Sequence, residues 1–275
     1  MNAHLVQIDT AWEDRAENHR RCDAMLERAG VGAGDLVVLP EMFDTGFSFR
    51  LERTNDSDRM TLGYLRGLAK RLGATVHGSR TVMGPDGRGR NRATIVGPGG
   101  EVLAEYDKVH PFSYGRESEF FGGGDRVGTY PWVGSGVGSG VGTGGSLTVC
   151  PAICYDLRFP ELFRLGVLRG AEVFALGANW PEPRKHHREA LGVARAIENQ
   201  AYMLCVNRAG SDPHLTYAGG SFAVDPKGAV IARADEGPCV MRVGVDPGLV
   251  RAWRAEFPAL RDIRLIGDHG RPPVG

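Results

Sequence analysis

Residues 149–164 read VCPAICYDLRFPELFR, and this stretch decides the fold class. An apolar run of strand length ends at Cys154. Pro160 and Glu161 then open a helix, because proline suits the first helical turn and a carboxylate suits the positive end of the helix dipole. Cys154 is therefore predicted at a strand-to-helix turn, where backbone N–H groups stabilise a thiolate or an oxyanion. A free cysteine is often only a small buried hydrophobe, so this stretch alone leaves both interpretations open.

Strands and helices alternate along the rest of the chain. Apolar, often β-branched runs predict strands at 5–8, 36–39, 75–77, 147–154, 173–176 and 202–206. Helical spacing of apolar residues predicts helices at 13–29, 58–72 and 186–200. Gly-containing turns predict two hairpins, 91–96 with 101–106 and 221–224 with 229–233. The pattern indicates an α/β protein with mixed sheets and two similar halves, the second of which opens at strand 147–154.

The composition is that of a globular protein with balanced charge. The chain has 275 residues, of which 42% are hydrophobic, and 33 Lys and Arg residues balance 33 Asp and Glu residues. A zero net charge gives no electrostatic reason to expect nucleic acid or an anionic membrane as a partner. The first residues lack a basic segment followed by an apolar one, and no apolar run is long enough to cross a bilayer. We therefore expect a cytoplasmic protein whose partner is a small molecule or a second copy of the chain.

Neither the cysteines nor the histidines form a metal-binding pattern. The five cysteines, at positions 22, 150, 154, 205 and 239, make neither an even disulfide framework nor two close pairs. His186 and His187 are adjacent and so point in different directions, and the pair of Cys150 and Cys154 lacks a second pair. We expect reduced thiols, no metal and no cofactor.

The run VGSGVGSGVGTGG at 133–145 is low in sequence complexity. Glycine loses much backbone entropy on ordering and offers almost no side chain to bury, so the run is predicted to be a flexible loop. A phosphate-binding loop is the alternative interpretation. It is disfavoured because no Lys-Ser or Lys-Thr follows the run.

Two further segments carry candidate catalytic residues. In LVVLPEMFDTGF, at 36–47, Glu41 follows a strand that reads as fully buried, at the sheet edge where open α/β proteins bind ligands. Partial desolvation there would make Glu41 a better base, and the alternative is an exposed loop glutamate. In AEYDKVHPF, at 104–112, Lys108 follows a hairpin strand. Beside a carboxylate and a thiol it would stay charged and bind an oxyanion, and the alternative is an ordinary solvated lysine.

Taken together, Leu-Pro-Glu, Tyr-Asp-Lys-Val-His and Ile-Cys-Tyr-Asp-Leu-Arg-Phe-Pro-Glu resemble, in order, the three signature motifs of the nitrilase superfamily of carbon-nitrogen hydrolases. The resemblance implies a four-layer αββα sandwich with two mixed sheets, and we take residues 1–275 as a single domain of this type. It implies Glu41 as general base, Lys108 as oxyanion stabiliser and Cys154 as nucleophile. It also singles out Glu117 as a second glutamate that supports Lys108, with Glu119 as a competitor for that role.

Within the superfamily, residues 179–210 and the cysteine motif are most similar to the omega-amidase branch. This similarity implies hydrolysis of the terminal amide of 2-oxoglutaramate, 2-oxosuccinamate or succinamate through a cysteine thioester. An amide that carries a carboxylate needs a cation, and Arg158 supplies one unless it forms an internal salt bridge with Asp156 or Glu161. The predicted substrate-binding residues are Tyr155, Arg158, Phe43 and Trp180.

Other functions remain open at this point. A nitrilase or an acyltransferase would use the same triad on another substrate. A binding module of the same fold would have lost the chemistry, although the intact Glu41, Lys108, Cys154 and Glu117 argue against that. The resemblance also implies a homodimer formed through the second half of the chain, and the apolar helical face of 162–168 is consistent with such an interface.

Overall fold

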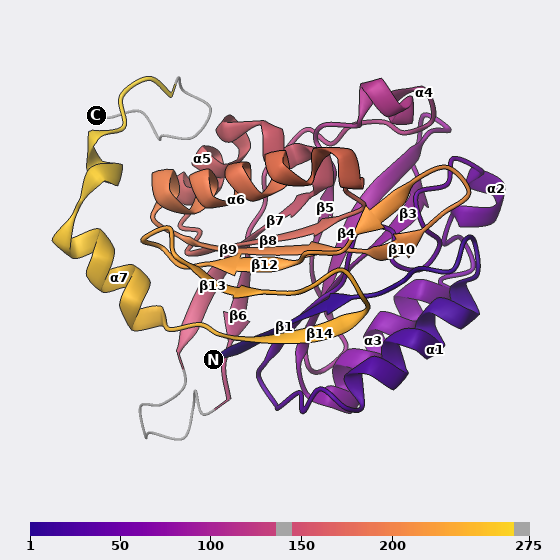
Figure 1. Ribbon diagram of the computed structural model, residues 1–275, viewed down its shortest axis with the longest axis horizontal. Helices are drawn as coiled ribbons and strands as arrows, with labels where there is room; N and C mark the ends of the chain where they lie inside the picture. The colour runs from indigo at the N-terminus through magenta and orange to yellow at the C-terminus, as the bar shows by residue number, and fades with distance from the viewer. Residues whose placement is uncertain (136–144, 267–275) are drawn as a thin grey trace.

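The protein is an α/β sandwich of two six-stranded mixed sheets with helices on both outer faces (Figure 1). This computed structural model describes residues 1–135 and 145–266. The predicted four-layer fold class is confirmed. The predicted flexible loop at 133–145 falls largely on 136–144, which lie outside the described residues. Within the described ranges, no helix is both long and apolar enough to cross a membrane.

The first sheet has the strand order β14-β1-β2-β3-β4-β5. Its strands are β1 (Asn2–Gln7), β2 (Leu36–Val38), β3 (Thr75–Met83), β4 (Gly89–Val96), β5 (Val102–Asp107) and β14 (Cys239–Gly244). The three strands β1, β2 and β3 are parallel, whereas β14 pairs antiparallel with β1 at one end and the predicted β4–β5 hairpin adds two antiparallel strands at the other.

The second sheet repeats this plan with the order β13-β12-β9-β8-β7-β6. Its strands are β6 (Tyr130–Val133), β7 (Ser146–Ile153), β8 (Val173–Ala178), β9 (Tyr202–Asn207), β12 (Phe222–Val224) and β13 (Val230–Arg233). Here β7, β8 and β9 are parallel, β6 flanks β7, and the predicted β12–β13 hairpin flanks β9. The predicted two similar halves are therefore confirmed. A small separate sheet joins β10 (Ala209–Ser211) to β11 (Thr216–Ala218).

Four long helices cover the sheets (Figure 1). The first sheet is covered by α1 (Arg15–Leu26) and α3 (Met60–Leu72), and the second by α5 (Pro160–Leu168) and α6 (Lys185–Asn199). All four follow the predicted segments. The helices α3, α5 and α6 present an apolar stripe to the sheet that each covers, whereas α1 buries the polar Asn18 and His19 beside Cys22 and Leu26. The short helices are α2 (Leu51–Thr54), α4 (Glu117–Phe120) and the 3₁₀ turns η1 (Ser113–Gly115), η2 (Cys154–Arg158), η3 (Glu182–Arg184) and η4 (Ala259–Asp262).

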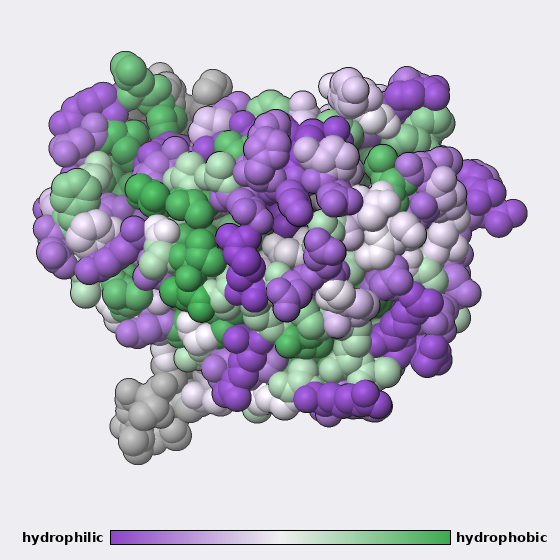
Figure 2. Space-filling view, viewed as in Figure 1, coloured by the Kyte–Doolittle hydropathy of each residue, from purple (hydrophilic) through white to green (hydrophobic). Residues whose placement is uncertain are grey.

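The C-terminal helix α7 (Pro247–Glu256) follows β14 and lies at one side of the sandwich (Figure 1). On the same view, apolar residues gather over β13 and the neighbouring end of α6 (Figure 2). The exposed apolar side chains there are Ile197, Val230 and Ile231, which are 53%, 42% and 43% exposed. These three residues are called the apolar patch below.

The main core lies between the two sheets, where β2 packs against β8. Gly177 in β8 makes this contact close, because a Cβ atom there would lie only 2.7 Å from the carbonyl oxygen of Leu39. A side chain at this position would push the two strands apart. Because Gly177 has no side chain, the segment after β2, which carries Glu41, lies directly against the second half of the molecule.

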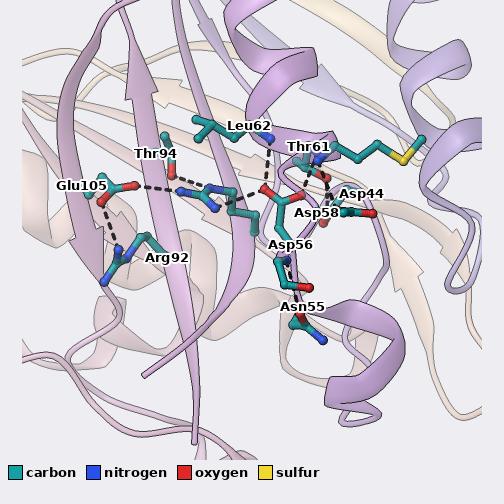
Figure 3. A network of polar contacts seen from close by, with 12 residues as sticks. Asp44, Asn55, Asp56, Asp58, Thr61, Leu62, Arg92, Thr94 and Glu105 are labelled. Atoms are coloured by element: carbon teal, nitrogen blue, oxygen red, sulfur yellow. Dashed lines mark hydrogen bonds and ion pairs between the residues drawn. The ribbon is translucent and has the colours of Figure 1, made fainter. Parts of the chain in front are cut away.

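A buried polar network holds the loop after β2 against α3 and β3 (Figure 3). Asp56 accepts hydrogen bonds from the backbone N–H groups of Thr61 and Leu62 at the start of α3, at 2.8 and 3.0 Å. It also pairs with Arg80 of β3 at 3.1 Å. Asp44, in the loop after β2, accepts a hydrogen bond from the Thr61 hydroxyl at 2.7 Å. The loop is thus tied to a helix N-terminus and to the sheet.

Candidate active site

Glu41 and Cys154 each follow the end of a central parallel strand, one from each sheet. In both cases the chain turns sharply, since the next residue Met42 and Cys154 itself have φ angles of 42° and 46°. This left-handed region is costly for side chains other than glycine, and such strain gathers at functional sites. The predicted strand-to-helix turn at Cys154 is present: η2 and then α5 follow β7 directly. Cys154 is 9% exposed and Glu41 is fully buried, which excludes an exposed loop position for the glutamate.

The side chain of Lys108 lies between two buried carboxylates. Its Nζ donates to Oε1 of Glu41 at 2.8 Å and to Oε2 of Glu117 at 2.7 Å. All three side chains are at most 1% exposed. The solvated-lysine interpretation is therefore wrong. Glu119, the competitor for the second glutamate position, is exposed and pairs with Arg116 instead.

Two asparagines complete the polar shell around these carboxylates. The side-chain amide of Asn91 donates to Glu41 at 2.7 Å and to Glu117 at 3.2 Å. Asn179 donates its backbone N–H to Oε2 of Glu41 at 2.9 Å and its side-chain amide to the Glu41 carbonyl at 2.7 Å. Sequence reasoning missed both residues as site residues. Asn91 opens a hairpin strand with no motif around it, whereas the position of Asn179 directly after β8 was a usable signal.

Asp156 connects the lysine segment to the cysteine turn. Its carboxylate accepts hydrogen bonds from the Tyr106 hydroxyl at 2.7 Å and from the backbone N–H of His110 at 3.0 Å, and these residues flank Lys108. The same carboxylate accepts the backbone N–H of Ile153 at 3.0 Å, directly before Cys154. One buried side chain thus fixes the position of the lysine relative to the thiol.

The electrostatics of the site favour a neutral thiol beside a charged lysine. Burial raises the pKa of Cys154 well above its ordinary value, and the nearby charge of Glu41 raises it further. Burial alone would lower the pKa of Lys108, but the charges of Glu117 and Glu41 outweigh it and raise that pKa. Burial also raises the pKa of Glu117, against the opposing effect of Lys108. The thiol therefore needs a base before it becomes a nucleophile.

These residues form the floor of a small, partly open pocket. Tyr155, Arg158 and Trp180, which are predicted to bind substrate, line this pocket. Arg158 stacks over the Trp180 ring at 4.9 Å and contacts His187 Nδ1 at 3.2 Å. In the described part of the chain it pairs with neither Asp156 nor Glu161, so the internal salt bridge that competed with substrate binding is absent.

The prediction for Phe43 is wrong. Its ring is fully buried between α1, α3 and the first sheet, where it packs beside His19 and Tyr64. The aromatic ring that this segment contributes to the pocket is instead Phe47, whose ring centroid lies 5.5 Å from Lys108 Nζ. The chain turns between Glu41 and Phe47, with positive φ angles at Met42 and Gly46.

No cluster of three or more His, Cys, Asp or Glu side chains suited to a metal ion is found among residues 1–135 and 145–266. Glu41 and Lys108 on the pocket floor are instead paired with each other, and Glu41 also accepts hydrogen bonds from amide groups of Asn91 and Asn179. The arrangement offers a thiol, an adjacent carboxylate and a fixed ammonium group, which are the groups needed for acyl transfer through a covalent intermediate.

Comparison with known proteins places this geometry in context. A family model described as carbon-nitrogen hydrolase matches residues 2–255. The chain is 34% identical to the omega-amidase YafV of Escherichia coli (strain K12) over 261 residues, which covers 94% of each chain. It is 31% identical to the 2-oxoglutaramate amidase of Bacillus subtilis (strain 168), covering 94% of this chain and 96% of that one. A solved carbon-nitrogen hydrolase superfamily protein from Xanthomonas campestris, with an arsenic adduct in its active site, superposes with a TM-score of 0.86 at 32% identity and covers 97% of this chain and 98% of that one.

Proposed function

This chain belongs to the carbon-nitrogen hydrolase family, and from that premise we propose that it is an amidase that releases ammonia from the terminal amide of a small dicarboxylic acid monoamide. The observation that carries the proposal is the buried Lys108, held between Glu41 and Glu117 on the floor of the pocket that contains Cys154. The relatives named omega-amidase and 2-oxoglutaramate amidase support the substrate class.

The first half of the reaction forms a thioester. Glu41 takes the proton of the Cys154 thiol as the sulfur attacks the amide carbon, which the raised pKa of the thiol makes necessary. Lys108 uses two of its three N–H groups on the two glutamates, and the third, together with the backbone N–H of Tyr155, holds the oxyanion. A well-placed oxyanion donor is worth about 3 kcal/mol. Ammonia leaves with the proton returned by Glu41.

The second half of the reaction hydrolyses the thioester. Glu41 takes a proton from water, the resulting hydroxide adds to the thioester carbon, and the tetrahedral intermediate collapses to the carboxylic acid. The sulfur leaves and regains a proton from Glu41. Glu117 acts throughout as a positioning residue, because it contacts Lys108 and the backbone N–H of Phe112.

The far end of the substrate is held by Arg158. Its planar guanidinium faces the pocket over Trp180, and a carboxylate accepts two parallel hydrogen bonds from such a group. This interaction favours 2-oxoglutaramate, 2-oxosuccinamate or succinamate over a neutral amide of the same length.

Ammonia release from a panel of amides and nitriles tests this proposal. Succinamate and its 2-oxo relatives should be hydrolysed much faster than equally long neutral amides or nitriles. Arg158→Lys should raise KM for the acids and leave the neutral amide almost unchanged. Preference for a nitrile, or for a transfer acceptor other than water, would favour the nitrilase or acyltransferase with the same triad. No turnover of any compound would favour the binding module.

We further propose that the chain works as one cytoplasmic domain and forms a homodimer through its second half. The apolar face of 162–168 does not serve this purpose, because Leu162, Phe163 and Val167 are buried in their own protomer. The exposed apolar patch supports the proposal instead (Figure 2). Light scattering at micromolar concentration should give twice 29.7 kDa, and Ile231→Lys should shift the protein toward monomer.

A further inference from the structure

The rim of the active-site pocket carries a second guanidinium that the mechanism above does not use. Arg184 ends η3, directly before α6, and lines the pocket together with Arg158. Its Cζ lies 5.6 Å from the centroid of the Phe112 ring and 5.9 Å from that of Tyr114. Within the described part of the chain, neither Arg184 nor Arg158 forms an ion pair with a carboxylate. The rim therefore presents two uncompensated positive charges.

Aromatic contacts keep both guanidiniums on the same rim. Arg158 stacks on Trp180, and the Trp180 indole N–H donates to the carbonyl oxygen of Arg184 at 2.8 Å. On the other side, the rings of Phe112 and Tyr155 are 4.9 Å apart and contact Arg184 and Arg158, respectively. A continuous chain of side chains thus links the two cations around the opening.

The surroundings do not neutralise these two charges. Residues 184–188 read RKHHR, so further basic groups follow at the N-terminus of α6, where the helix dipole is also positive. Of the nearby acids, Glu189 pairs with Arg233 at 2.6 Å and Glu182 does not line the pocket. Glu41, on the pocket floor, is already engaged by Lys108. Two like charges at one opening are unfavourable unless an anion lies between them.

We propose that Arg158 and Arg184 form a two-guanidinium clamp, and that Arg184 makes the enzyme prefer monoamides of 2-oxo dicarboxylic acids over monoamides of plain dicarboxylic acids. This inference rests on the proposed function and names the residue that selects within its substrate class. A single carboxylate satisfies one guanidinium with two parallel hydrogen bonds. It leaves the second guanidinium without an acceptor. A 2-oxo acid adds a third oxygen beside the carboxylate, and that oxygen gives Arg184 its partner.

The matched substrates for the test are 2-oxosuccinamate and succinamate, which have the same length and differ in the oxo group alone. The quantity to measure is the ratio of their kcat/KM values. Arg184→Ala should lower this ratio by about tenfold, mainly through a higher KM for 2-oxosuccinamate, because one charge-assisted hydrogen bond is lost. The control is Lys185→Ala, which removes the same charge one residue further along but does not line the pocket. It should leave the ratio unchanged.

Binding of the two amides to the Cys154→Ala protein tests the clamp without turnover. Calorimetry with the two intact amides should show tighter binding of 2-oxosuccinamate, and adding Arg184→Ala should remove that preference. An unchanged ratio in both measurements, or an equal loss with Lys185→Ala, would overturn the clamp and leave the amidase proposal intact. If the wild-type protein releases no ammonia from either amide, the proposed function fails, and the calorimetric ratio still decides the clamp. Failure of both amides to bind would also overturn it.

Discussion

Two buried networks of charged side chains lie in the first half of the molecule, and they differ in how their charge is compensated. In the network of Asp56, Arg80 and Glu105, Arg80 pairs with both carboxylates, Glu105 also pairs with Arg92, and Asp56 also accepts the first N–H groups of α3 (Figure 3). This network reaches the surface, because the Glu105 side chain is 35% exposed. In the network of Glu41, Lys108 and Glu117, one ammonium serves two carboxylates, and all three groups are buried.

The difference separates a structural network from a reactive one. The first network is saturated: its carboxylates hold a helix N-terminus and a strand in place, and nothing in it faces the pocket. The second has a single cation for two buried carboxylates, next to a thiol that burial keeps protonated. Such a site accepts a proton readily, but burying its charged groups makes the folded state less stable. We expect substitutions in the first network to change stability and those in the second to change turnover.

The largest expected effect is that of Lys108→Met. It removes the single cation from two buried carboxylates, so it should reduce kcat by at least about 100-fold and destabilise the fold by about 3–5 kcal/mol. Ammonia release and urea unfolding measure the two effects. Lys108→Arg is the companion variant, because it keeps the charge; it should fold nearly as well as wild type yet stay almost inactive. Wild-type turnover in either variant would contradict the role of Lys108.

A smaller effect is expected for Glu117→Gln. It leaves the shape of the side chain but removes one of the two charges that hold Lys108 in position. The kcat should fall by about tenfold to 100-fold with little change in KM. Glu119→Gln is the matched control two residues away, on the exposed surface and paired with Arg116. If the two variants lose activity equally, Glu117 has no special connection to the chemistry.

In the saturated network, Asp56→Ala should change stability alone. It leaves Arg80 buried without this partner and removes the acceptor for two N–H groups of α3, so we expect a loss of about 3 kcal/mol in unfolding free energy. The kcat measured well below the melting temperature should stay within about twofold of wild type. A large loss of kcat in the fully folded variant would show that the two networks are coupled.

The smallest effect concerns the pH dependence of stability at Asp44. Burial raises the pKa of this carboxyl to about 6 in the folded protein. Because the folded pKa lies above the unfolded one, the folded state binds the proton more tightly. The contribution of Asp44 to stability is then largest below about pH 4, falls as the pH rises to about 6, and stays low above that. When the pH is raised from 4 to 7, the unfolding free energy of Asp44→Asn should increase by about 2 kcal/mol relative to that of wild type, as measured by denaturation at both pH values. If the difference between the two proteins is the same at pH 4 and pH 7, the carboxyl is already charged at pH 4.

The central strands, the four helices over the sheets and both hairpins could be predicted from the sequence because each has a local signal, whereas the edge strands β6 and β14 and the helix α7 were not predicted. The segment before Glu41 is a buried apolar run, Pro160 opens α5, and Gly-containing turns join the hairpins. The grouping of Glu41, Lys108 and Cys154 came from the order of three motifs. Their contacts could not be predicted, because they depend on how closely two sheets approach at Gly177.

Other parts of the site had no local signal. Asn91 lies in an ordinary hairpin strand. Its role arises only because β4 brings its side-chain amide within hydrogen-bond distance of both Glu41 and Glu117. Phe43 and Phe47 could not be told apart from the sequence, since both follow Glu41 within a few residues, and only the folded loop places Phe47 in the pocket and Phe43 in the core. Arg184 begins the basic run RKHHR, and nothing in the sequence separates it from basic side chains that lie in solvent.

Mass spectrometry of the acid-quenched protein during turnover tests the role of Cys154 most directly. With succinamate as substrate, the peptide that contains Cys154 should gain the mass of the acyl group, which is succinamate less ammonia. The adduct should be absent in Cys154→Ala, and substitution of the buried Cys150 or Cys205 should leave it in place. Ammonia release at the wild-type rate from Cys154→Ala, or steady turnover with the acyl group on another residue, would contradict a thioester mechanism at this cysteine.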